Sequence, residues 1–101
     1  MKVKLRKAGP NELKNPPQSM SGVVFGTQFS DHMFSMEWED GKGWHNAEIK
    51  PYGPLLMEPS SIVLHYAQMA FEGLKAYRTD SGENVLFRPR ENFKRMNNTS
   101  Q

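Results

Sequence analysis

The sequence predicts an α+β fold in which β-hairpins are covered by helices on one face. Residues 32–38 alternate with a period of two, and the Asp-Gly of "EDGKG" then predicts a hairpin turn. Two further apolar runs, "LKAYR" and "NVLFR", are separated by the turn-forming "TDSGEN". A helix-start signal follows each hairpin, at Ser60–Ser61 and at Pro89. The expected order is therefore arm, hairpin, helix, hairpin, helix.

The first hairpin is expected to bury one face of its leading strand, because alternate side chains of a strand point to opposite sides. One side of this strand has Met33, Ser35 and Glu37, and the other has Phe34, Met36 and Trp38. The return strand is expected over residues 44–50, where Pro51 stops it.

The first helix is expected over residues 62–71, with Ser60 or Ser61 capping its free N–H groups. Gly73 is expected to end it with a positive φ. The apolar stripe of this helix would consist of Ile62, Val63, Tyr66, Met69 and Ala70.

Residues 1–20 are polar and interrupted by three prolines, so we expect an N-terminal arm or linker. Residues 21–101 would form an incomplete small domain. The helix that begins at Pro89 has only Phe93 and Met96 as apolar anchors and no C-terminal stop signal. We therefore expect the chain to be a segment of something longer, which alone would leave apolar surface exposed.

Composition excludes several classes of function. The 101 residues carry a net charge of +2 with scattered basic residues, which argues against nucleic-acid binding. The chain has no cysteine, which rules out thiolate chemistry and fits a reducing, cytoplasmic location. No apolar run is long enough to cross a membrane. His32, His45 and His65 lack the spacing of paired metal ligands, so no metal site is expected.

Four side chains have both a structural and a functional interpretation. Tyr66 and Phe71 suit core packing or a pocket wall, and spacing favours packing. Arg95 suits a solvated basic face, although a guanidinium also clamps a phosphate. Lys75 could form a Schiff base, but it lies in an apolar strand beside Arg78 and a structural role is favoured. Residue types alone thus indicate a small α+β domain without a defined function.

Three sequence blocks taken together are more specific about function than these single residues. They are "FGTQFSDHMFSMEWEDGKGW", "PSSIVLHYAQMAFEGLKAYR" and "VLFRPRENFKRM". In this order and spacing they resemble the N-terminal part of the branched-chain amino acid aminotransferases, pyridoxal-phosphate enzymes of fold type IV. The resemblance runs from about Val24 to the end of the chain. The first block counts against the sibling D-amino acid aminotransferases and aminodeoxychorismate lyases. Ser30 stands where threonine is commoner in the family.

The resemblance implies roles for four residues. Arg95 matches the arginine that holds the phosphate of pyridoxal 5'-phosphate. Tyr66 matches a tyrosine of the substrate pocket, and Phe71 and Phe25 match aromatic walls of that pocket. Such walls suit aliphatic substrates, because each buried methylene adds to binding. His65 matches no catalytic residue.

The implied parent reaction moves the amino group of Leu, Ile or Val to 2-oxoglutarate in a homodimer, without nucleic-acid or membrane partners. The family's Schiff-base lysine lies downstream, and Lys75 does not match it, so the 101-residue chain is expected to be inactive alone. Two alternatives stay open. One is a non-catalytic, stand-alone binding module with the same fold, and the other is a sibling fold type IV enzyme.

Overall fold

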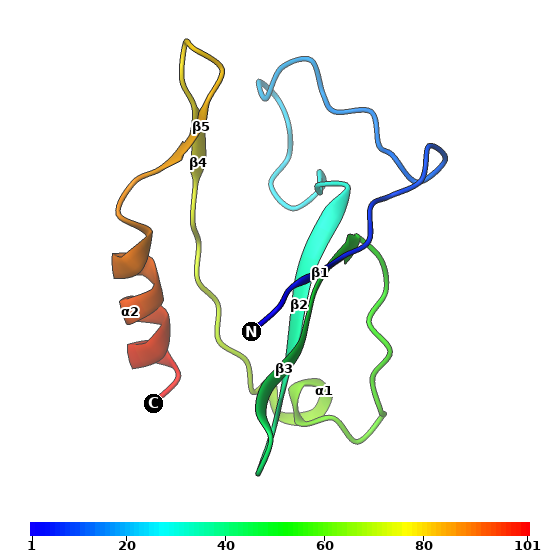
Figure 1. Cartoon of the computed structure of the whole chain (residues 1–101), viewed down its shortest axis with the longest axis vertical. Coiled ribbons are helices and arrows are strands. Elements are labelled where there is room, and N and C mark those ends of the chain that lie inside the picture. The colour runs from blue at the N-terminus through cyan, green and yellow to red at the C-terminus, as the bar shows by residue number, and fades with distance from the viewer. The chain divides into compact units, whose positions relative to one another are not determined.

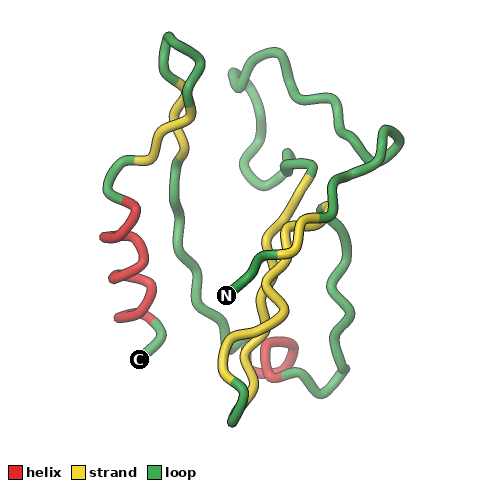
Figure 2. Tube along the Cα trace, in the orientation of Figure 1, coloured by secondary structure: helices red, strands yellow, loops and turns green.

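The computed structural model describes residues 1–101, which form two compact units, Met1–Leu55 and Leu56–Gln101. The first unit contains three strands, and the second contains two helices and two strands (Figure 1). Long loops connect many of the helices and strands, and the whole segment between the first two strands is a loop (Figure 2). The α+β class predicted from the sequence is therefore confirmed.

The first unit is built on a three-stranded sheet of order β1-β3-β2. β2 (His32–Glu39) and β3 (Gly43–Pro51) pair antiparallel, as the predicted hairpin requires. In the turn between them, Gly41 has a φ of 76°, a conformation that glycine adopts without strain. β1 (Lys4–Leu5) adds in parallel to β3, with Lys4 opposite Glu48.

Part of the predicted arm thus contributes to the sheet. The N–H of Ala8 also donates to His32 Nε2 at 2.8 Å, which ties the segment after β1 to the start of β2. The division into an arm of residues 1–20 and a domain from residue 21 stays a prediction.

A β-bulge interrupts the hairpin in its middle. Ser35 lies opposite Glu48, whereas Glu37 lies opposite His45, so β3 contains one extra residue between these pairs. Asn46 lies in this stretch with a φ of 53°, which asparagine tolerates better than most residues. Its Nδ2 donates to Glu37 Oε2 at 2.8 Å across the strands.

A second feature of this unit is a loop over residues 14–31 that is closed at its base. The N–H of Lys14 donates to Asp31 Oδ1 at 2.8 Å, and Lys14 Nζ donates to the carbonyl of Ser30 at 2.9 Å. The same ammonium lies 4.2 Å from the ring centre of Tyr52, on which Phe29 stacks at 4.9 Å. One lysine therefore joins both ends of the loop to the end of β3.

The second unit contains the second predicted hairpin, formed by β4 (Ala76–Arg78) and β5 (Asn84–Leu86). α2 (Pro89–Thr99) begins at Pro89, as predicted. The extended segment that leads into β4 runs alongside α2 (Figure 1). Neither helix of the chain is long and apolar enough to cross a membrane.

The first helix is shorter than predicted. α1 spans Ile62–Tyr66 and ends at Ala67, whose φ is 51°, so the predicted extension to residue 71 is wrong. Gly73 does not end it and has no positive φ. Ser61 is the N-cap, but its side chain makes no capping hydrogen bond. A helix gains most of its stability from a packed face, and α1 buries no residue. No packing therefore stabilises further turns beyond its five residues.

The chain has almost no core. Ala47 is the only buried hydrophobic residue, and the predicted buried face of β2 is wrong, since Phe34 and Trp38 are more than half exposed. The accessible surface is 9597 Å², against about 5,800 Å² for a folded monomer of this mass. Two separate globules of the sizes of the two units would still expose only about 7,000 Å². The expected exposure of apolar surface is thus confirmed, and neither unit by itself forms a helix-covered sheet.

Candidate functional site

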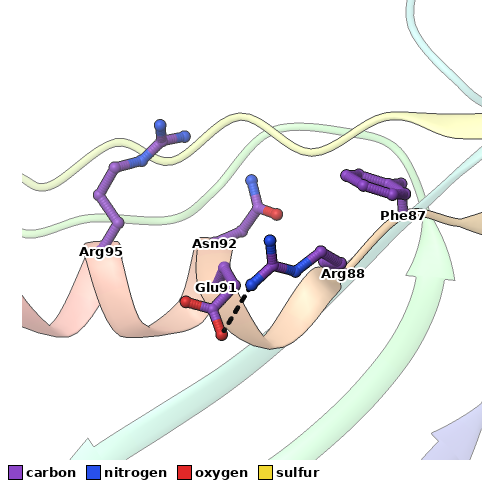
Figure 3. A pocket seen from close by; sticks show the side chains of 5 residues that line it. All are labelled: Phe87, Arg88, Glu91, Asn92 and Arg95. Carbon is purple, nitrogen blue, oxygen red and sulfur yellow. Dashed lines mark ion pairs between the residues drawn. The ribbon is translucent and has the colours of Figure 1, made fainter.

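An open hollow lies along α2, with a volume of about 360 Å³. Its lining side chains are Phe87, Arg88, Glu91, Asn92 and Arg95. The last four stand at positions i, i+3, i+4 and i+7, which places them on one face of a helix. In Figure 3 the side chains of Asn92 and Arg95 extend from the same side of α2. The hollow is therefore a helical surface with two guanidinium groups.

One carboxylate partly balances these cations. Glu91 Oε1 lies 3.9 Å from Arg88 Nη2 (Figure 3). The same oxygen accepts a hydrogen bond from Lys94 Nζ at 3.0 Å. All three side chains are at least half exposed, and such pairs are weak in water. An anion of sufficient charge could therefore displace Glu91 from Arg88 at little cost.

Arg95 is held much more firmly, by Glu72 from the segment alongside the helix. Arg95 Nε donates to Glu72 Oε2 at 2.8 Å, and Arg95 Nη2 donates to Glu72 Oε1. This is the two-point geometry in which a guanidinium binds a carboxylate best. The Glu72 side chain is only 8% exposed, whereas that of Arg95 is 66% exposed. The carboxylate is thus the sheltered partner, and the guanidinium reaches solvent.

Asn92 supports the same carboxylate. Its Nδ2 donates to Glu72 Oε1 at 3.2 Å and to the carbonyl of Gly73 at 2.8 Å. The N–H of Gly73 also donates to Glu72 Oε1, at 3.1 Å. Glu72 Oε1 therefore accepts from Arg95, from Asn92 and from the backbone N–H of Gly73, whereas Oε2 accepts from Arg95.

This network perturbs both titrating groups. The hydrogen bonds from Arg95 lower the pKa of Glu72 to about 2, against a partial opposing effect of desolvation, and Asn92 contributes in the same direction as Arg95. The hydrogen bond to Glu72 raises the pKa of Arg95 in turn. The pair is therefore fully ionised at neutral pH.

The residues singled out from the sequence are not all brought together. Tyr66 is the last residue of α1 and is 82% exposed, and Phe71 lies in the irregular segment after it and is 79% exposed. Neither lines the hollow beside α2. Phe25 belongs to the first unit, where it lines an apolar hollow of about 380 Å³ within the closed loop, together with Met20, Val23, Val24, Gly26, Gln28 and Phe29. Of the predicted site residues, the hollow along α2 contains only Arg95.

Comparison with known proteins is decisive about kinship. The chain is 54% identical over 81 residues to the branched-chain-amino-acid transaminase 1 of Bacillus subtilis, a match that covers 80% of this chain and 23% of that protein. It is 51% identical over 85 residues to the cytosolic branched-chain-amino-acid aminotransferase of Saccharomyces cerevisiae, with 84% and 23% covered. It is 48% identical over 99 residues to a probable branched-chain-amino-acid aminotransferase of Staphylococcus aureus, with 98% and 26% covered.

The chain is related to the branched-chain-amino-acid aminotransferases. The resemblance read from the three sequence blocks is therefore confirmed, and it concerns an N-terminal segment of these aminotransferases. The chain spans about a quarter of the length of the curated relatives it matches. No protein-family model matches it.

Sequence reasoning missed two residues of the aminotransferase segment, Glu72 and Asn92. Glu72 stands in "FEG" and Asn92 in "ENFKR", inside two of the blocks that carry the resemblance. The signal that could have found Glu72 is its charge, because a carboxylate among the apolar residues Ala70, Phe71 and Leu74 favours a cation as partner. Nothing in the spacing of 23 residues between Glu72 and Arg95 points to that particular pair.

Proposed function

We propose that this chain is part of a branched-chain amino acid aminotransferase, which transfers the amino group of Leu, Ile or Val to 2-oxoglutarate with pyridoxal 5'-phosphate. The observation that carries the proposal is the identity of about one residue in two with such enzymes across most of the chain. When bound, the cofactor supplies the electron sink for the transfer. The residues of this chain contribute binding and orientation.

The hollow along α2 fits the phosphate group of that cofactor. A phosphate at neutral pH carries nearly two negative charges, and Arg88 and Arg95 both line the hollow. Glu72 uses the N–H of Arg95 Nε and one N–H of Nη2. A guanidinium has five N–H donors, so three remain, two on Nη1 and one on Nη2. These three can donate to phosphate oxygens while the bond to Glu72 persists, so we assign the cofactor phosphate to Arg95.

Tyr66, Phe71 and Phe25 are proposed as walls of the substrate pocket. All three rings are more than three quarters exposed in this chain, which leaves their faces free for an aliphatic side chain or for further protein. A ring that closes over a methyl or methylene group removes apolar surface from water and so favours Leu, Ile and Val over polar amino acids.

The wider assignments follow from the same proposal. The segment would belong to the small domain of a fold type IV enzyme, with residues 1–20 as an arm and residues 21–101 as an incomplete domain, and helices would cover its hairpins in the assembled protein. The parent would be a cytoplasmic homodimer without nucleic-acid or membrane partners, in keeping with a chain that lacks cysteine. The 101 residues alone would be inactive, because the Schiff-base lysine of the family would lie elsewhere in the parent protein.

The phosphate assignment is tested in the intact protein that carries this sequence. Arg95→Ala should weaken the binding of pyridoxal 5'-phosphate by about tenfold or more, because it removes a charge-assisted pair of donors. The binding of pyridoxal, which has no phosphate, should stay unchanged. Arg90→Ala is the matched control, since it removes an arginine of α2 that does not line the hollow. Equal effects of both substitutions would disprove the assignment.

The substrate assignment needs a separate measurement. The intact protein is offered leucine, D-alanine and aminodeoxychorismate in turn. Leucine should react fastest, with 2-oxoglutarate as acceptor. If leucine were inert and one of the others reacted, the protein would be a sibling enzyme, and if none reacted and pyridoxal 5'-phosphate did not bind, a non-catalytic binding module would be the better account.

A further inference from the structure

The best-defined polar contact of the second unit joins Arg95 to Glu72, a carboxylate that the sequence did not single out. Glu72 binds Arg95 through both carboxylate oxygens, and its side chain is 8% exposed on a unit that buries no hydrophobic residue. Apolar packing does not account for the low exposure of Glu72, because no hydrophobic residue of this unit is buried. The hydrogen bonds of the carboxylate therefore hold the side chain in this position. The second carboxylate near the hollow, Glu91, is half exposed and makes only one-point contacts.

The two-point bond decides how Arg95 presents its remaining donors. A guanidinium is planar, so fixing the edge made by Nε and Nη2 also fixes the direction of the edge made by Nη1 and Nη2. Without such a bond the long side chain would sample several rotamers at the surface. Asn92 holds the carboxylate to the backbone of the neighbouring segment, so it limits the movement of the pair as a whole.

We propose that Glu72 is the positioning residue for Arg95, and that it pre-orients the guanidinium for the phosphate of a pyridoxal-type cofactor. The inference rests on the proposed function, because it takes the phosphate as the ligand of Arg95. Glu72 makes no contact with the ligand in this account and acts only through Arg95, with Asn92 as its support. A bond of this kind lowers the conformational entropy that binding costs.

The direction in which phosphate affinity changes when Glu72 is replaced separates a positioning role from a purely electrostatic one. The Glu72 carboxylate carries the same sign of charge as the phosphate, so removing that charge alone would strengthen phosphate binding. Losing the orientation of Arg95 would weaken it. In Glu72→Gln an amide nitrogen replaces one acceptor and confronts an N–H of Arg95, so the two-point bond is lost while the size of the side chain is kept.

The test compares pyridoxal 5'-phosphate with pyridoxal as ligands of the intact protein, by equilibrium titration. Glu72→Gln should raise the Kd of pyridoxal 5'-phosphate about tenfold, by analogy with the lower end of the range for partners that orient metal-ligating side chains. The Kd of pyridoxal should be unchanged. Glu83→Gln is the matched control, because Glu83 carries the same charge in the same unit and its side chain makes no hydrogen bond or ion pair. The control should leave both Kd values unchanged.

An unchanged or lower Kd of pyridoxal 5'-phosphate in Glu72→Gln would overturn the inference, as would an equal loss for both ligands. Should this variant fail to fold, Asn92→Ala decides, since it removes the support of Glu72 without a change of charge: a selective loss of pyridoxal 5'-phosphate affinity supports the inference, and an unchanged affinity overturns it. Arg95→Ala distinguishes a failure of the positioning role of Glu72 from a failure of the phosphate assignment itself. If it weakens phosphate binding while Glu72→Gln does not, only the positioning role fails, and if neither does, the phosphate assignment fails with it.

Discussion

Replacing Lys14 by methionine should loosen the closed loop over residues 14–31. Methionine keeps an unbranched, apolar stem of similar length but has no ammonium group. The substitution therefore removes the hydrogen bond from Nζ to the carbonyl of Ser30 and the contact with the Tyr52 ring. It leaves the backbone bond from Lys14 to Asp31 in place.

The magnitude follows from these two contacts. An exposed hydrogen bond contributes about 1 kcal/mol net, and a cation–π contact at an exposed site about 0.5 to 1 kcal/mol. Their loss should lower the free energy of opening the loop by about 1.5 kcal/mol, and 1.4 kcal/mol corresponds to about a tenfold change in an equilibrium constant. The loop carries Phe25, so the same change should also loosen a proposed wall of the substrate pocket.

Amide hydrogen exchange in the intact protein measures this opening. The protection factor of the residue 14 amide, which donates to Asp31, should fall about tenfold. The amide of Arg6, which donates to the carbonyl of Ile49 between β1 and β3, serves as an internal reference. Lys7→Met is the control variant, because Lys7 makes no hydrogen bond or ion pair. Unchanged protection at residue 14, or the same loss in the control, would refute the reasoning.

Three further predictions concern backbone strain and charge. Asn46→Ala should lower the free energy of unfolding by about 1 to 2 kcal/mol in urea titrations, because alanine resists the positive φ at the bulge, and Asn46→Gly should come closer to the wild type. Ala67→Gly should raise it by about 1 kcal/mol, because it relieves the left-handed conformation at the end of α1, whereas Ala70→Gly, without a positive φ, should not. The third change is acidification. The lowered pKa of Glu72, about 2 against an ordinary 4.5, means that its stabilising pair is complete above pH 4.5, declines below that and is lost as the pH falls through about 2. The difference in unfolding free energy between the wild type and Glu72→Gln should follow this course, and a difference already absent at pH 4 would contradict the pairing.

Local chemistry accounts for what the sequence predicted correctly. Both hairpins follow from turn residues that lie next to each other in the chain, such as Gly41 and Gly82, which have positive φ values of 76° and 84°. α2 begins at Pro89 because proline already has a helical φ and lacks the N–H that a first helical position cannot use. These features need no partner from elsewhere in the molecule.

The wrong predictions concern features that depend on tertiary packing, namely the length of α1 and the burial of one face of β2. The prediction of α1 followed an apolar stripe to residue 71, but the helix buries no residue and ends at Ala67. The prediction of one buried face of β2 assumed a covering layer, and Ala47 is the only hydrophobic residue that the chain buries. An apolar pattern shows which side chains could be buried, and it cannot show whether the surface that would cover them is present.

The sequence by itself determined the two hairpins and the start of α2, because each of these depends on residues close together in the chain. It also determined the kinship and singled out Arg95, because the order of three blocks along the chain is preserved in the sequence whether or not it is folded. Only the tertiary structure decided that Glu72 and Asn92 hold Arg95, that Lys14 closes the loop carrying Phe25, and that Asn46 lies at a bulge. The physical reason is range. Turn and cap chemistry acts over a few residues, whereas an ion pair between residues 23 positions apart exists only after the chain has folded back on itself.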